Sequence, residues 1–222
     1  MSIGGTPSEE TKETGRIEAF SDGVFAVAIT LLALDLKVPH DMADGRSLGR
    51  ALLAQWPSYL AFVTSFATIG IMWINHHRLF THIRRTDNTL LVLNGLLLLG
   101  VTFVPFPTAV VAEYIPRPAG QAAAVLFSGT YAVLAVLFNL LWRYSSGKNR
   151  LLDRRADPRA VAAITRGYSV GPPLYFLSFA LAFVNVGASI VMNLLLAIFF
   201  ALPTQNLLIR QKARSSSTPW GA

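Results

Sequence analysis

The chain has 222 residues, of which 53% are hydrophobic and 14% are charged, and its formal net charge is +7. A soluble domain carries roughly 25% charged residues, so this composition excludes an ordinary soluble protein and predicts an all-α membrane protein. There is no cysteine, which excludes disulfides, thiol redox chemistry and cysteine metal sites.

The apolar stretches and the polar breaks between them predict six transmembrane helices. Residues 1–15 are polar and hold no basic segment ahead of an apolar run, so we expect a disordered cytoplasmic tail and no cleaved signal peptide. A six-helix membrane domain follows over residues 16–210, and residues 211–222 form a second cytoplasmic tail. The expected helices cover residues 16–37, 47–73, 88–111, 119–142, 168–184 and 189–209, each near the ~20 residues that a span needs.

The connections between these helices carry their own signals. Asp157-Pro158 is typical of a helix N-cap followed by proline at the first helical position. Pro105 and Pro107 predict a kink or an end in the third helix. We identify no internal repeat. The expected connections are a basic, His-rich turn over 76–87, a polar loop over 143–166 and a tight turn at 185–187.

The placement of Lys and Arg predicts the orientation of the chain. With a cytoplasmic N-terminus, all but four of the 19 Lys and Arg residues fall in inner segments. The four outer residues are Lys37, Arg46, Arg50 and Arg117. Basic residues concentrate on the cytoplasmic side of membrane proteins, so both termini are expected in the cytoplasm. The basic charge is therefore a topology signal, and no nucleic-acid partner is expected.

The first helix differs from the others in carrying carboxylates. The apolar run between Asp22 and Asp35 is roughly 18 Å long at 1.5 Å per residue, which is shorter than the ~30 Å hydrocarbon core. A spanning helix must therefore bring a carboxylate to the membrane edge or inside it. Such carboxylates usually face a protein interior or a water-filled path, so we do not expect this helix to be a simple lipid-facing one.

The sequence around this helix resembles a known family. Arg16, Phe20, Ser21 and Asp22 match the RxxxFSD signature of the transmembrane protein 175 family, the endolysosomal potassium channels and their prokaryotic relatives. The resemblance covers the first half of the chain well and the second half mainly by hydropathy. It continues through Thr30-Leu31-Leu32, Leu34-Asp35, Trp73, His76, Phe80, Asn94 and Thr102-Phe103-Val104-Pro105.

The resemblance implies a homotetramer in which the first helix of each subunit lines a central pore for monovalent cations, with potassium preferred. The pore and gate residues would be Val27, Thr30, Leu31 and Leu34. On an ideal helix Thr30 lies about 60° and Leu34 about 20° from Val27, so all share one stripe. Valine stands where the family usually has Ile or Leu, so the narrowest point could be Val27 or Leu34. Without the resemblance, these residues would be read as packing positions.

Asp22 lies about 140° from Val27 on the same helix and would face neighbouring helices. The family motif implies a structural polar network made of Arg16, Phe20, Ser21, Asp22, His76, His77 and Asn94. A proton-relay role for Asp22 is the alternative, because intramembrane acids serve as relays. His76 and His77 are adjacent and diverge on a helix, so no metal site is expected.

Three classes of function compete on the sequence alone. The leading one is a potassium-preferring channel with a hydrophobic constriction and a threonine ring, in the cell inner membrane. The alternative is a proton-coupled secondary transporter or a proton-permeable channel that uses Asp22. An enzyme is not expected, because HExxH and GxSxG motifs are lacking and there is no Cys. No cofactor is expected beyond the permeant potassium ion, and the other partners are the lipid bilayer and further copies of the chain.

Overall fold

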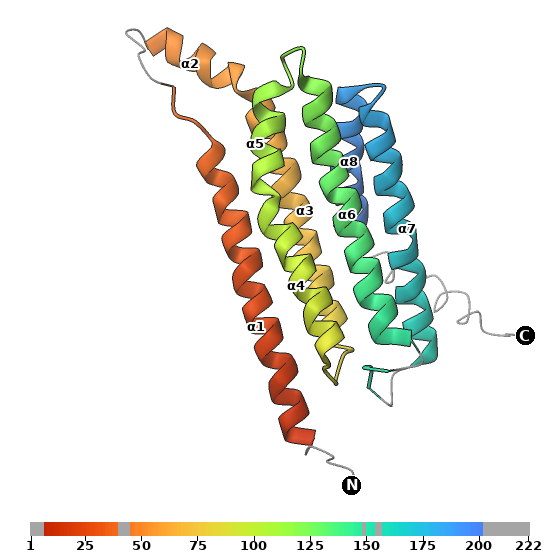
Figure 1. Cartoon of the computed structure of the whole chain (residues 1–222). Coiled ribbons are helices and arrows are strands. Elements are labelled where there is room, and N and C mark those ends of the chain that lie inside the picture. The colour runs from red at the N-terminus through yellow and green to blue at the C-terminus, as the bar shows by residue number, and fades with distance from the viewer. Residues whose placement is uncertain (1–6, 40–44, 148–149, 154–156, 202–222) are drawn as a thin grey trace, which may run out of the picture.

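The chain folds into an all-helical bundle in the computed structural model (Figure 1). The structure describes residues 7–39, 45–147, 150–153 and 157–201. The helices are α1 (Pro7–Leu31), the 3-10 helix η1 (Leu32–Asp35), α2 (Gly45–Ala54), α3 (Trp56–Phe80), α4 (Asn88–Phe103), α5 (Pro105–Tyr114), α6 (Gly120–Ser146), α7 (Pro158–Ala182) and α8 (Val186–Ala201).

Helix α1 begins earlier than expected and changes character at its end. It starts at Pro7, so residues 7–15 continue the helix and the prediction of a disordered tail over them is wrong. Proline is favoured at the first helical position, which agrees with the start of α1 at Pro7. The rest of that predicted tail, residues 1–6, lies outside the described residues, as do residues 202–222 with the predicted C-terminal tail.

The second predicted helix is two helices. A short helix, α2, ends at Ala54, and α3 begins at Trp56 with Pro57 in its first turn. Proline has no backbone N–H to donate and cannot continue a preceding helix, which explains the break. Helix α3 then runs on to Phe80, so the first residues of the predicted turn, including His76 and His77, are helical.

The prolines of the third predicted helix act as expected. Helix α4 ends at Phe103 and α5 starts at Pro105, with Val104 between them. The predicted cap at Asp157 is also confirmed: its side chain accepts a hydrogen bond from Arg159 N, and Pro158 opens α7. Helix α7 therefore starts ten residues before the expected position, inside the predicted polar loop. The turn into α8 lies at residues 183–185, slightly before the expected one.

Within the residues that the structure describes, four stretches are long and apolar enough to cross a membrane, namely Thr14–Asp35, α3, Asn88–Tyr114 and α6. Helix α7, with Pro172 and Pro173 inside it, and the shorter α8 are not among them. The six-span topology and the orientation of the termini therefore stay predictions.

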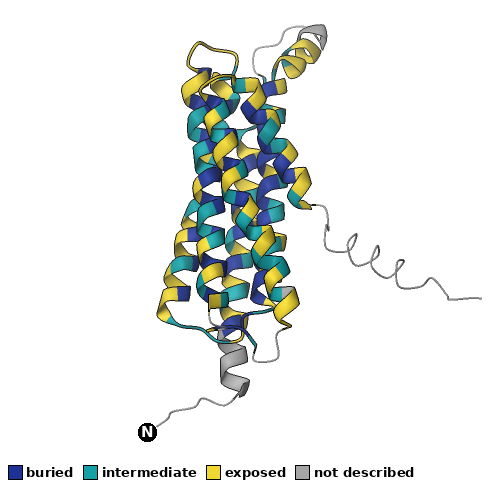
Figure 2. Cartoon of the chain, turned by 90° about the vertical axis from the view of Figure 1, so that its right-hand side faces the viewer, coloured by how far each residue is buried: buried dark blue, intermediate teal, exposed yellow. Residues whose placement is uncertain are grey.

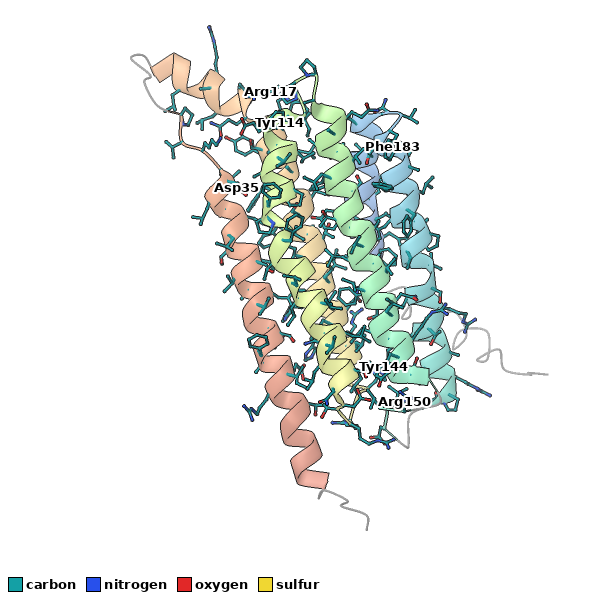
Figure 3. All side chains as sticks on the ribbon, viewed as in Figure 1. Asp35, Tyr114, Arg117, Tyr144, Arg150 and Phe183 are labelled. Atoms are coloured by element: carbon teal, nitrogen blue, oxygen red, sulfur yellow. The ribbon has the colours of Figure 1, made fainter. Side chains whose placement is uncertain are left out.

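Buried residues run through the interior of the bundle, and exposed residues cover its outside (Figure 2). Polar and aromatic side chains mark its two ends. Figure 3 places Asp35, Tyr114 and Arg117 at one end and Tyr144 and Arg150 at the other. At the first end Arg117 lies over the Tyr114 ring, 5.1 Å from its centroid. This chain is an all-helical membrane protein.

Candidate functional site

Helix α1 packs against the bundle with one face only. Ser21, Phe25, Ala28 and Leu32 are all buried, at the spacing of three and four residues that places side chains on one side of a helix. This face contacts α3, α4 and α5. The packed face is thus continuous from the motif serine to the start of η1.

The opposite face of α1 is open. Val27 is 54% exposed, Leu31 39% and Leu34 77%, and Thr30 is exposed as well. The Thr30 hydroxyl donates to the carbonyl of Val27 at 2.9 Å. We call these four residues the open stripe. The structure therefore brings the four predicted pore residues together on one uncharged face that the rest of the chain leaves uncovered.

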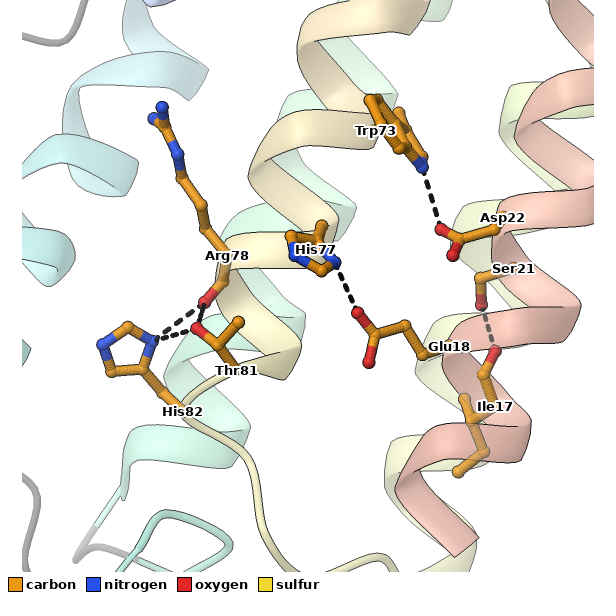
Figure 4. Close-up of polar contacts among 9 residues, drawn as sticks. All are labelled: Ile17, Glu18, Ser21, Asp22, Trp73, His77, Arg78, Thr81 and His82. Carbon is orange, nitrogen blue, oxygen red and sulfur yellow. Dashed lines mark hydrogen bonds and ion pairs between the residues drawn. The ribbon is translucent and has the colours of Figure 1, made fainter. Parts of the chain in front are cut away.

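Two polar contacts tie α1 to α3 on the flank of the packed face (Figure 4). Trp73 Nε1 donates to Asp22 Oδ1 at 2.8 Å. One turn away, towards the start of α1 and the end of α3, Glu18 pairs with His77. Residues four apart lie above one another on a helix, so the pair Glu18 and Asp22 faces the pair His77 and Trp73 as two rungs of a ladder.

A second polar chain lies deeper in the same region. His76 Nε2 donates to Asn94 Oδ1 at 2.9 Å, and Asn94 Nδ2 donates to Ser21 Oγ at 3.0 Å. The Ser21 hydroxyl in turn donates to the carbonyl of Ile17 at 2.8 Å. His76 is fully buried, and its ring stacks on Phe80 with 4.5 Å between centroids. His76 of α3, Asn94 of α4 and Ser21 of α1 thus form a chain of hydrogen bonds in which each residue donates to the next.

The predicted network is only partly assembled in the structure. Ser21, His76 and Asn94 meet, and Asp22 and His77 lie beside them with partners of their own. Arg16 and Phe20 lie exposed on α1, away from these contacts. Sequence reasoning missed Trp73 and Glu18 as partners. The signal was available, because Glu18 and Asp22 share the spacing of Trp73 and His77.

The second half of the chain contains a buried polar cluster that the sequence did not reveal. Asn193 Nδ2 lies 3.0 Å from Ser128 Oγ and 2.9 Å from Ser178 Oγ. The hydroxyls of Ser128 and Ser189 are 2.6 Å apart. All four residues are fully buried. They join α6, α7 and α8 without any charged group.

The loops at the end marked by Tyr144 are tied together by Asp87, the N-cap of α4. Its carboxylate accepts from Leu90 N at 2.8 Å and from the Tyr144 hydroxyl at 2.6 Å, and Arg150 donates to that hydroxyl. Partial burial opposes the charge of Asp87, but the Tyr144 and Leu90 hydrogen bonds and the nearby Arg150 outweigh it and lower its pKa. The carboxylate of Asp87 therefore joins the start of α4 to the end of α6.

These features define an all-helical membrane protein in which one helix presents an uncharged stripe to its surroundings. Residues 16–105 match the family described as the endosomal/lysosomal potassium channel TMEM175. A potassium channel of Chamaesiphon minutus is 53% identical over 194 residues, covering 87% of this chain and 96% of that protein. The chain belongs to the TMEM175 family, whose members are ion channels.

Two further comparisons agree with this membership. The crystal structure of a lysosomal potassium-selective channel TMEM175 homologue from Chamaesiphon minutus matches with a TM-score of 0.78 at 50% identity, covering 86% of this chain and 97% of that one. The human endosomal/lysosomal proton channel TMEM175 is 38% identical over 135 residues, which cover 57% of this chain but 27% of the human protein.

Proposed function

We propose that the chain is the subunit of a potassium-preferring cation channel, a homotetramer with α1 of each subunit around a central pore. The open stripe is the observation that carries this proposal. It is uncharged, it lies on the helix with the family motif, and it faces away from the subunit that holds α1 in place. The similarity to proteins named as potassium channels supports the choice of ion.

In such a pore, Val27 and Leu34 would form apolar rings on either side of Thr30, with Leu31 at the edge of the stripe. Apolar constrictions gate by dewetting, without any charged gate. The Thr30 hydroxyls would replace part of the hydration shell of a passing ion. The chain has no TVGYG segment, so selectivity would not come from a carbonyl filter of that kind.

Six crossings and cytoplasmic termini, in the cell inner membrane, complete the proposal. The support is the bias of Lys and Arg, with Arg117 and three other basic residues outside. Because the chain has no cysteine, single cysteines can be labelled without background. We expect a membrane-impermeant maleimide to label Arg117→Cys in intact cells, and to label Gly147→Cys only after the membrane is opened. The reverse pattern would contradict the orientation.

Flux from potassium-loaded liposomes that contain purified protein tests the pore. With a protonophore present, Val27→Ala should increase flux by several-fold because it widens an apolar ring. The matched control is Val191→Ala on α8, where the side chain is 50% exposed. An equal effect of both substitutions would overturn the pore assignment.

Thr30→Val tests the threonine ring because it removes the hydroxyl and keeps the shape. We expect a weaker preference for potassium over sodium. Thr102 is an ideal control, since it is also exposed and its hydroxyl also bonds the carbonyl three residues earlier, at 2.8 Å. Thr102→Val should leave the preference unchanged.

A proton-permeable channel that uses Asp22 is the second candidate, favoured by the similarity to the human protein named as a proton channel. Proton-coupled transport is its variant. Liposome flux without the protonophore separates these ideas. Asp22→Asn keeps an acceptor for Trp73, so potassium flux should survive in the channel that we propose, whereas a pathway that depends on Asp22 would lose proton movement.

A further inference from the structure

A cavity of about 470 Å³, partly open to the outside, lies between helices away from α1. Helices α3, α6, α7 and α8 supply its walls. Its volume is within the range of about 300–1,000 Å³ for small-molecule sites. Neither the open stripe nor the contacts of Asp22 include any residue that lines it.

The walls of the cavity change from apolar to polar along α3. Met72 lines it together with Phe138, Tyr175 and Phe200 from the other helices. Towards the end of α3 the lining includes Asn75 and Arg78. From Thr68 to His82 the lined part of the chain is roughly 20 Å long at the helical rise. The cavity is therefore elongated, with an apolar part and a polar end.

Arg78 supplies a positive charge to the polar end. Its side chain leaves α3 away from His77 and α1 (Figure 4). Its carbonyl accepts from Thr81 and His82, but its guanidinium makes no hydrogen bond or ion pair with any residue in the described part of the chain. A guanidinium binds phosphate strongly, often through two parallel hydrogen bonds.

Further arginines lie in the helix ends and loops at this end of the subunit. They are Arg84, Arg85, Arg143, Arg150 and Arg166. Basic pockets between transmembrane helices on the cytoplasmic side bind the head groups of anionic lipids. The positive charge at the polar end of the cavity and the apolar side chains of its other part therefore match an anionic lipid.

We propose that this cavity binds one anionic phospholipid, with an acyl chain in the apolar part and the phosphate on Arg78. The chain would run along α3 beside Met72 and Phe138. A zwitterionic lipid offers less favourable charge to Arg78 and the neighbouring arginines, so the site should discriminate by head group. The lipid would contact the side of α3 opposite to the one that holds α1 through Trp73.

Lipid retention by the full-length purified protein tests this proposal by native mass spectrometry. Delipidated protein receives equal amounts of phosphatidylglycerol and phosphatidylcholine with identical acyl chains. We expect wild type to retain phosphatidylglycerol preferentially. Arg78→Gln should reduce that retention about tenfold, as loss of a charge-assisted hydrogen bond would, and Arg78→Lys should keep most of it. Because lipid is measured directly, the result does not depend on ion conduction.

Two controls separate the site from general surface charge. Arg84→Gln removes an arginine of the same end, which pairs with Asp153 at 3.7 Å and does not line the cavity, and it should change little. Gly171→Leu fills the cavity, because the nearest atom to an added Cβ would be Phe200 Cζ at 3.8 Å. It should reduce retention without changing charge, whereas Gly95→Leu, at a position outside the cavity where an added Cβ meets nothing within 4 Å, should not.

Equal retention of both lipids by wild type would overturn the proposal, as would equal losses in Arg78→Gln and Arg84→Gln. Retention that falls in Arg78→Gln but not in folded Gly171→Leu would place the lipid on the surface and refute the cavity site. If Gly171→Leu fails to elute as a folded protein, the difference in lipid retention between Arg78→Gln and Arg84→Gln still tests the proposal.

Discussion

The two halves of the chain use the same contact to join their helices. In the first half, Asn94 on α4 donates to Ser21 on α1 at 3.0 Å. In the second half, Asn193 on α8 donates to Ser128 on α6 at 3.0 Å. Each serine follows a phenylalanine in the sequence. An amide from the third long segment thus holds the first helix in both halves.

What surrounds the contact differs between the halves. Asp22 follows Ser21, whereas Gly129 follows Ser128 and lets Phe179 approach, since an added Cβ would lie 3.1 Å from that ring. In the apolar segment of α6, 50% of the residues are buried inside the bundle, whereas in that of α1 only 22% are buried. The same Asn–Ser contact therefore occurs on α6, which is largely enclosed by the bundle, and on α1, which keeps one uncovered face.

The largest expected difference between the halves is in cross-linking between subunits. Val27→Cys on α1 should form covalent dimers in most of the protein when membranes are treated with a short bis-maleimide, because four copies would surround one axis. Val133→Cys on α6, 57% exposed in the wild type, should form almost none. Gel mobility under denaturing conditions reads the result. Equal cross-linking of both variants, or none of Val27→Cys, would contradict the expected difference between α1 and α6.

The two asparagines should also differ in their effect on stability. Asn94→Leu leaves buried His76 without its Asn94 contact, and we expect a loss of about 2 kcal/mol, given about 1–3 kcal/mol for each unsatisfied buried group. Asn193→Leu should cost about 1 kcal/mol, because the Ser128–Ser189 and Ser178–Ser189 contacts remain. Unfolding in mixed micelles, followed by tryptophan fluorescence, measures both. A larger loss for Asn193→Leu would contradict this order.

The sequence predicted much of the first half because its signals are local. Periodicity placed Val27, Thr30 and Leu34 on one face of α1, and the structure leaves that face open. Proline chemistry predicted the break before Pro105 and the cap at Asp157. These features depend on residues within a few turns of each other.

Contacts between distant segments were not predictable in the same way. Hydropathy treats Ser128 and Asn193 as small interruptions of apolar helices, so their meeting could not be read from either helix alone. The partner of Asp22 was missed although the sequence carried a signal for it, namely the four-residue spacing that Glu18 and Asp22 share with Trp73 and His77. Helix ends were also misplaced at Pro7 and Pro158, because polar residues continue both helices beyond their apolar parts.

The ladder between α1 and α3 belongs to the first half only, and its loss should have a moderate effect. Trp73→Phe removes the donor to Asp22 while keeping a large aromatic ring. We expect a loss of about 1 kcal/mol in the free energy of unfolding. The control is the same substitution in an Asp22→Asn background, where the indole of Trp73 meets a neutral acceptor. Because a hydrogen bond to a charged group is stronger, Trp73→Phe should cost less there, and an equal loss in both backgrounds would contradict the special role of the ladder.

The smallest expected difference concerns the two caps, Asp87 of α4 and Asp157 of α7. Replacing an N-cap by alanine costs roughly 0.5–2 kcal/mol. Asp87→Ala should lie near 1 kcal/mol because Tyr144 also bonds the carboxylate. Asp157→Ala should lie near the lower limit of that range, since its cap bond is exposed.

Acid unfolding sharpens this last comparison. The pKa of Asp87 is lowered in the folded state, so its charge stabilises the fold above the unfolded value of about 3.9. That contribution is lost as the pH falls through the lower folded pKa. Asp87→Asn should therefore flatten the decline in stability below about pH 4. A decline as steep as that of wild type would show that the Asp87–Tyr144 contact does not hold the two loops together in solution.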